Sequence, residues 1–167
     1  MARPKKEKFK KYKLDSIEDL LNMRLTKSKI IHNRNKEMKF CEIIQGDLKE
    51  IFNNLGYDIE IINREFSLQY GRCDFICKTK DNKYLISEVK VKNEKASIDY
   101  ELNLSYAIGQ LLTYKTIMID QYKLKADDID LFLIGDEDSL IALRTIQENN
   151  LNIKIIIFGE EGVKIYG

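Results

Sequence analysis

Apolar residues recur at helical spacing in two long segments of the chain. The first covers residues 36–55, where they form one stripe with a period of about 3.6, and Gly56 follows as a stop signal. A second stripe covers residues 96–123, and shorter helical patterns cover 16–24 and 139–150. We therefore expect two long and two short helices. The first long stripe contains Phe40, Ile44, Leu48, Ile51, Phe52 and Leu55.

Short apolar segments, either alternating or nearly continuous, predict six strands between and after these helices. Three of them follow the first long helix, and the turn sequence KDNK joins the last two of these as a hairpin. The final segment is expected to be an edge strand. The order of helices and strands predicts a mixed α/β domain. The predicted strands are 57–68, 71–79, 83–91, 129–135, 152–159 and 162–167.

Three charged residues interrupt the apolar pattern of the hairpin strands. Asp74 lies inside RCDFICKT, and Glu88 and Lys90 lie inside KYLISEVKV. Unpaired charges are costly in an apolar layer, so these side chains need partners. Because residues i and i+2 of a strand share a face, Glu88 and Lys90 point the same way, and a suitable turn places Asp74 opposite them. We expect the three charges to converge and to neutralise one another in part.

Two carboxylates beside a cation suit the hydrolysis of a phosphodiester around a divalent metal. Mg²⁺ prefers oxygen ligands and usually takes one or two protein carboxylates, which Asp74 and Glu88 could supply. The backbone carbonyl of Val89 could be a further ligand. Lys90 could orient a water or stabilise charge that develops on the phosphate. The predicted cofactor is therefore Mg²⁺, or Mn²⁺ in its place.

Charge is distributed unevenly along the 167 residues. The net charge is +1, but residues 1–40 carry 13 Lys/Arg against 5 Asp/Glu. A basic arm on an acidic body favours a polyanionic partner such as DNA, although a solubilising tail would have the same composition. The candidate nucleic-acid-binding residues are Lys5, Lys6, Lys8, Lys10, Lys11 and Lys92.

The composition also excludes other classes of protein. No apolar segment approaches the roughly 18 residues that a membrane helix needs, so we expect no membrane partner and a cytoplasmic location. An odd number of cysteines argues against a disulfide scaffold, and two sulfurs do not make a zinc site. We expect Cys41, Cys73 and Cys77 to be buried thiols, with Cys73 and Cys77 able to share one face of their strand.

Asp74, followed after thirteen residues by Glu88-Val89-Lys90, resembles the motif of the PD-(D/E)XK nuclease superfamily. The resemblance covers about residues 37–135 and implies the restriction-endonuclease-like core, α-β-β-β-α-β, with a central mixed sheet flanked by helices. In AIGQLLTYK, Gln110 and Tyr114 resemble the Q-x-x-x-Y motif of the RecB-like branch. This second resemblance implies that both side chains contact DNA or support the active site.

The chain departs from the family pattern at the first long helix. Many members carry a metal-binding Glu there, at the position where this chain has Gln45. Glu42 is our first choice for the acid that completes the metal site, and Asp47 is the second. The proline that gives the motif its name is also absent, because Cys73 precedes Asp74.

Together these features predict a basic arm with a short helix over residues 1–35 and a nuclease-like domain over 36–167. The resemblance implies a metal-dependent deoxyribonuclease in which a metal-activated water hydrolyses DNA, as an endonuclease or an exonuclease. The alternative is a catalytically inactive nuclease fold that binds DNA or serves in assembly. Related nucleases often act as homodimers, although this sequence has no feature that directly supports a dimer.

Overall fold

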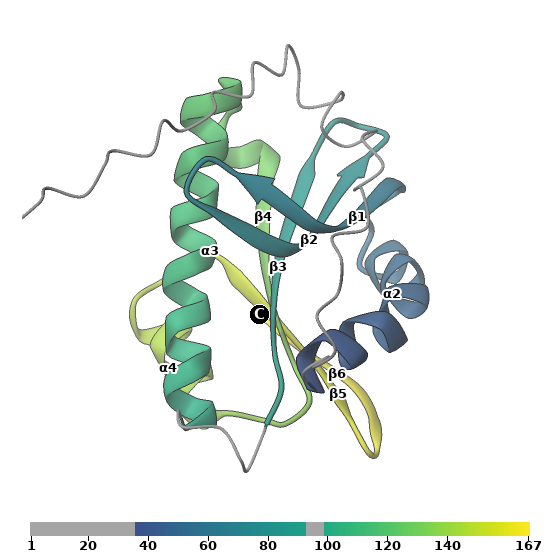
Figure 1. The fold of residues 1–167 in the computed structure, drawn as a ribbon, viewed down its shortest axis with the longest axis vertical. Coiled ribbons are helices and arrows are strands. Elements are labelled where there is room, and N and C mark those ends of the chain that lie inside the picture. Colours follow the sequence, from purple (N-terminus) through teal and green to yellow (C-terminus); the bar gives the residue numbers. More distant parts are fainter. Residues whose placement is uncertain (1–35, 93–98) are drawn as a thin grey trace, which may run out of the picture.

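A mixed six-stranded sheet forms the centre of the molecule (Figure 1). The structure is a computed structural model that describes residues 36–92 and 99–167; the predicted arm and short helix of residues 1–35 lie outside them. The strands lie side by side in chain order, antiparallel from β1 to β3, parallel from β3 to β5, and antiparallel again at β6. They are β1 (Ile59–Leu68), β2 (Gly71–Thr79), β3 (Tyr84–Lys90), β4 (Ile129–Gly135), β5 (Ile153–Gly159) and β6 (Gly162–Tyr166).

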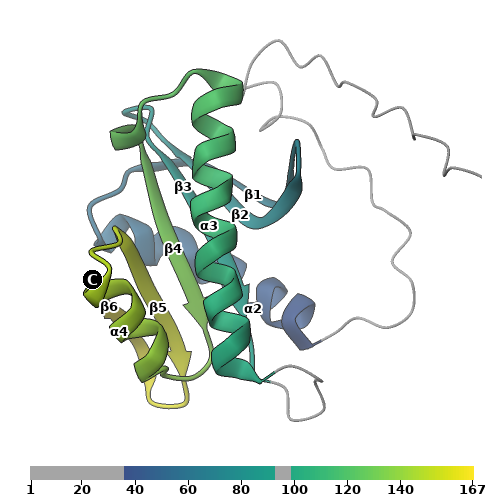
Figure 2. The ribbon, with the colours of Figure 1, turned by 90° about the vertical axis from the view of Figure 1, so that its left-hand side faces the viewer.

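Helices cover both faces of the sheet. α3 (Tyr100–Tyr122) and α4 (Leu140–Glu148) connect the parallel strands and lie on one face, and α2 (Lys36–Asn54) lies on the other (Figure 2). A short 3-10 turn, η1 (Ala126–Asp128), leads into β4. The order α2-β1-β2-β3-α3-β4 is the predicted α-β-β-β-α-β core, which is thus confirmed. Within the described part of the chain, no helix is both long and apolar enough to cross a membrane.

The core has two layers, one on each side of the sheet. Between the sheet and α3 and α4, Ile86, Leu111 and Leu133 are fully buried. Between the sheet and α2, Leu48 and Phe52 pack against the opposite faces of the same strands. The stripe on α2 that the sequence predicted therefore faces the sheet, and burial of these apolar side chains is the main stabilising contribution.

The β1–β2 hairpin changes direction near the middle of its strands. The register places Glu65 opposite Asp74. Glu65 has φ of 53°, a left-handed conformation that is uncommon for a residue with a side chain. Cys73 packs on the α3 side and Phe75 on the α2 side, although residues two apart in a regular strand share a face. The hairpin therefore bends at Glu65 and Asp74, and its tip reaches α3 (Figure 1).

The bend explains one wrong prediction about the cysteines. All three are buried free thiols, as expected. Cys73 and Cys77, however, do not share a face, because Cys73 lies in the α3-side core and Cys77 in the α2-side core. The interruption of alternation at Asp74 separates them. Burial raises the pKa of both thiols above its ordinary value, so neither is a reactive thiolate.

The start of α3 is fixed to the end of β4. Asp99 caps the helix by accepting a hydrogen bond from the Glu101 N–H at 2.9 Å. The Tyr100 hydroxyl donates to the Glu137 carbonyl at 3.0 Å and lies directly over Gly135. A methyl group at position 135 would collide with that hydroxyl, so an alanine there would force Tyr100 to shift.

Gly135→Ala is expected to destabilise the protein by about 1–3 kcal/mol, because the new Cβ displaces the Tyr100 hydroxyl. Adding Tyr100→Phe removes the colliding oxygen and should recover part of the loss. Chemical denaturation of the single and double variants measures both effects. Gly46→Ala is the matched control: nothing lies within 4 Å of the position that a Cβ would take there, in the middle of α2, so it should stabilise by up to about 1 kcal/mol.

Candidate active site

The structure brings Asp74, Glu88 and Lys90 together at the edge of β3. The β2–β3 ladder ends at the pair Phe75 and Ser87, and continuing this register places Asp74 opposite Glu88. At this point the side chain of Asp74 replaces the missing backbone partner, since its Oδ2 accepts a hydrogen bond from the Val89 N–H at 2.7 Å. The short turn between β2 and β3 thus sets the strand register that brings Asp74 opposite Glu88, as the sequence predicted.

The site exists because β2 leaves the sheet before β3 ends. β2 and β3 pair only as far as Phe75 and Ser87, whereas β3 continues to Lys90. From Glu88 onward, the edge of β3 that faces β2 has no strand beside it among the described residues. Side chains from the α2 layer and from the α3 layer can therefore both reach this edge.

Glu88 and Lys90 are buried even though both carry ionisable groups. Glu88 is 3% exposed and Lys90 is 8% exposed. Lys90 Nζ donates to Glu88 Oε1 at 3.0 Å, which satisfies one oxygen of the carboxylate. The other oxygen, Oε2, is also buried but has no hydrogen-bond partner within residues 36–92 and 99–167. An unsatisfied buried carboxylate oxygen is costly, so its retention requires an explanation.

Glu37, at the start of α2, is the acid from the first helix that lies at this cluster. Its side chain is half-buried, and its Oε1 lies 3.9 Å from Lys90 Nζ. Glu42 and Asp47, the two acids preferred from the sequence, are exposed instead. Glu42 follows Glu37 by five residues, which is about 140° around the helix. The signal for Glu37 was the buried stripe itself, because Glu37 precedes the buried Cys41 by one helical turn.

Burial and mutual repulsion dominate the electrostatics of the cluster. Burial, followed by repulsion from Asp74, raises the pKa of Glu88 to about 7. Burial also raises the pKa of Asp74 and that of Glu37. For Lys90, burial acts to lower the pKa, but attraction to Glu88, Glu37 and Asp74 is stronger and raises it. The ammonium thus stays charged, and Glu88 is the carboxyl that titrates near neutral pH.

The donor atoms fit a divalent cation. In the described ranges, no three His, Cys, Asp or Glu side chains lie close enough together to form a complete metal cluster. Mg²⁺ commonly takes only one or two protein carboxylates, and Asp74 and Glu88 meet that need. Glu88 Oε2 is a buried oxygen that still lacks a partner. When ionised, the three carboxylates outnumber the one ammonium by two charges, which a divalent cation would balance.

Gln110 and Tyr114 lie beside the cluster on α3. The Tyr114 hydroxyl donates to the Arg72 carbonyl at 3.1 Å, and Gln110 Nε2 donates to the same hydroxyl oxygen at 3.4 Å. Burial and the nearby Glu88 raise the pKa of Tyr114 above its ordinary value, so the phenol is neutral. In this structure the pair therefore holds the start of β2 against α3.

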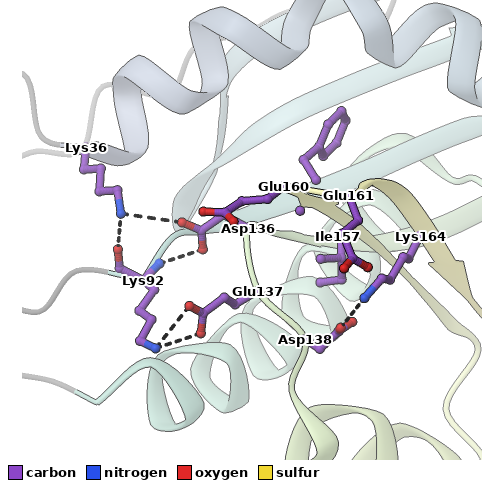
Figure 3. Close-up of a pocket in the computed structure, with 11 residues that line it drawn as sticks. Lys36, Lys92, Asp136, Glu137, Asp138, Ile157, Glu160, Glu161 and Lys164 are labelled. Atoms are coloured by element: carbon purple, nitrogen blue, oxygen red, sulfur yellow. Dashed lines mark hydrogen bonds and ion pairs between the residues drawn. The ribbon is translucent and has the colours of Figure 1, made fainter.

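Lys92 lies at a separate cavity of about 840 Å³, where the ends of β3, β4 and β5 meet (Figure 3). Its Nζ lies 2.8 Å from a carboxylate oxygen of Glu137. Lys36 and Lys164, which also line this cavity, pair with Asp136 and Asp138. The charge of Lys92 is thus already engaged by protein. The other candidate DNA-binding lysines, from Lys5 to Lys11, lie outside the described residues.

Comparison with known proteins gives matches at the level of structure only. The chain matches no known family model and no curated protein sequence. An XisH family protein from Nostoc punctiforme superposes with a TM-score of 0.51 and 16% sequence identity, over 77% of this chain and 98% of that protein. An fdxN element excision controlling factor protein from Anabaena variabilis gives a TM-score of 0.46 and 15% identity, over 72% of this chain and 92% of that one.

A repair endonuclease from Pyrococcus abyssi also matches, with a TM-score of 0.44 and 18% identity. The match covers 67% of this chain but only 45% of the endonuclease, so the chain spans less than half of that protein. At these identities, the similarity to the XisH family protein shows a shared fold. The fold class predicted from the sequence is thus supported by the order of the elements and by that similarity.

Proposed function

We propose that this protein is a metal-dependent nuclease that hydrolyses DNA phosphodiester bonds at the cluster of Asp74, Glu88 and Lys90. The observation that carries the proposal is the buried and unpartnered Glu88 Oε2, beside a second carboxylate and a lysine on an open strand edge. A purely structural ion pair would have no reason to leave a carboxylate oxygen unsatisfied. A cation ligand would have to keep that oxygen available.

Each residue has a distinct part in the proposed reaction. Asp74 and Glu88 would hold the cation, which when bound would lower the pKa of a water and polarise the phosphate. Asp74 is oriented by the Val89 N–H, and Glu88 by Lys90. Lys90 would offset negative charge that develops on the phosphate oxygens, because its ammonium stays protonated inside the carboxylate cluster. Glu37 would help to keep Lys90 charged and in place.

The test is a cleavage assay on labelled single-stranded, duplex and branched DNA with Mg²⁺, Mn²⁺ or EDTA. Wild-type protein should cleave with either metal and not with EDTA. Asp74→Asn keeps an acceptor for the Val89 N–H but removes the charge, so cleavage should be lost. Asp47→Asn, an exposed change on α2, is the control and should cleave normally. Metal-independent cleavage, or full activity of Asp74→Asn, would contradict the proposal.

The second candidate function is a nuclease fold that binds DNA without cutting it. It is favoured by one observation: Glu37, the α2 acid at the site, already lies near Lys90, and no complete three-acid metal cluster is present in the described residues. DNA binding by the wild-type protein, without cleavage under any metal condition, would favour this function over hydrolysis.

A further inference from the structure

We propose that Tyr70 and Tyr106 stack on unpaired bases on either side of the cluster, so that the site takes single-stranded or frayed DNA rather than intact duplex. This inference rests on the proposed function and adds the class of substrate to it. It starts from two exposed aromatic side chains, which are 76% and 54% exposed. Both lie on elements that border the cluster of Asp74, Glu88 and Lys90.

Tyr70 lies at the tip of the β1–β2 hairpin. The tip begins beyond the bend at Glu65 and Asp74, so it projects from the sheet next to the carboxylates. Arg72 lies in the same part of the hairpin. Its side chain is 57% exposed, and its Nη1 lies 3.5 Å from Glu65 Oε1. Proteins that bind single strands stack bases on exposed aromatic rings beside positively charged side chains that follow the backbone.

Two contacts hold this tip against α3. Gly71 lies against the ring of Tyr114, and a Cβ at position 71 would approach Tyr114 Cε1 to 2.9 Å. The hydroxyl of Tyr114 holds the carbonyl of Arg72 at 3.1 Å. Tyr114 is itself buried and close enough to Glu88 for the carboxylate to affect its pKa. α3 therefore holds Tyr70 and Arg72 at a set place beside the cluster.

Tyr106 lies on the side of α3 that carries Gln110 and Tyr114, the two residues that hold the start of β2. Tyr106, Gln110 and Tyr114 follow one another at intervals of four residues, so they share one side of the helix. Tyr114 is buried, Gln110 is half-buried and Tyr106 is exposed, so the row rises from the sheet to the surface. Leu112, six residues after Tyr106, lies about 240° around the helix and thus on the opposite flank.

The two tyrosines favour a strand whose bases are not paired. An aromatic side chain stacks on the face of a base, and in a duplex those faces are covered by neighbouring base pairs. Tyrosine rings do not repel DNA, whereas the carboxylates of the cluster repel phosphates until a cation is present. Stacking would therefore provide binding that does not depend on the metal.

Binding of short labelled single strands and duplexes, measured by fluorescence anisotropy in EDTA, tests the inference without cleavage. Tyr70→Ala and Tyr106→Ala should each weaken single-strand binding by about tenfold. Tyr70→Phe and Tyr106→Phe keep the ring and should bind as wild type does. Leu112→Ala on the opposite flank of α3 is the control and should change nothing. Stacking on 2-aminopurine in the strand should quench its fluorescence in wild type and less in the Ala variants.

The outcomes separate this inference from the proposed function. Weaker single-strand binding by both Ala variants, with rescue by Phe, supports stacking. Unchanged binding by the Ala variants, or tighter binding to duplex than to single strands, overturns the inference but leaves metal-dependent cleavage standing. Cleavage without Mg²⁺ or Mn²⁺, or cleavage by Asp74→Asn, counts against the proposed function and not against stacking. Failure of wild type to bind any DNA in EDTA overturns the inference, because stacking should not need the metal, and leaves metal-dependent cleavage standing.

Discussion

Glu88→Gln is expected to abolish metal binding and cleavage and yet to make the protein more stable at pH 8. Gln keeps an oxygen that can accept from Lys90 Nζ, but it has no charge to bury beside Asp74. The buried carboxylate of Glu88 has its pKa raised from 4.5 to about 7, so its ionised form destabilises the fold. The charge of Glu88 thus lowers the stability of the fold, but the proposed metal site needs that charge.

The raised pKa of Glu88 determines how its contribution to stability changes with pH. Between pH 4.5 and about 7, folded Glu88 binds more protons than unfolded Glu88, so stability from this group falls as pH rises through that window. Above it, the cost is about 3–4 kcal/mol, because the pKa rises from 4.5 to about 7 and one pKa unit corresponds to about 1.4 kcal/mol. The melting temperature of Glu88→Gln should exceed that of wild type by about 6–16 °C at pH 8, and the difference should vanish near pH 4.

Thermal melts without metal, from pH 4 to 8, measure this difference, and calorimetric titration with Mn²⁺ measures the loss of binding. Glu50→Gln, an exposed change on α2, is the matched control and should alter neither quantity. A melting temperature of Glu88→Gln below that of wild type at pH 8 would contradict the idea that the Glu88 charge is costly. Mn²⁺ binding retained by Glu88→Gln would contradict its role as a ligand.

Lys90→Ala is expected to reduce cleavage by at least about 10²–10³-fold, the size found when a charge-stabilising group is removed from an active site. Unlike Glu88→Gln, it should retain Mn²⁺ binding, because both proposed carboxylate ligands remain. It should also destabilise the protein at pH 8 by about 3–5 kcal/mol, since buried carboxylates then lack their cation. Single-turnover cleavage and Mn²⁺ titration separate these two effects.

The double variant Glu88→Gln with Lys90→Ala tests the interaction of the two residues even if Lys90→Ala alone fails to fold. Removing both partners leaves fewer unpaired charges, so the double variant should be more stable than Lys90→Ala alone. Additive stability changes in this cycle would mean that Glu88 and Lys90 do not interact across their 3.0 Å contact. Full cleavage by Lys90→Ala, with its fold intact, would remove Lys90 from the proposed reaction.

Most of the fold could be predicted from local patterns. The predicted strand 71–79 matches β2, and the prediction 129–135 matches β4, because apolar periodicity reports directly on burial. The meeting of Asp74 with Glu88 and Lys90 could also be predicted, since the short turn before β3 leaves little freedom of register. These features depend on residues that are close in sequence.

What could not be predicted depends on distant contacts. At the bend, Glu65 adopts the left-handed backbone conformation although it is not glycine. Nothing in the local sequence predicts that conformation for Glu65. Which acid of α2 lies at the cluster depends on how α2 lies over the open edge of β3. There the carboxylate of Glu37 reaches Lys90. A helical stripe gives the buried side of α2 but not which strand end that side meets.

The hydrogen bond from the Val89 amide to Asp74 Oδ2 makes one backbone proton an indicator of the state of the site. In an ordinary ladder that proton would report only on the opening of the sheet. Here its acceptor is a side chain whose pKa is raised by burial and which would also hold the cation. The chemical shift and the solvent exchange of the Val89 amide should therefore change with protonation of Asp74 and with added Mg²⁺. Nuclear magnetic resonance could thus follow loading of the site in the unmodified protein, without DNA and without turnover.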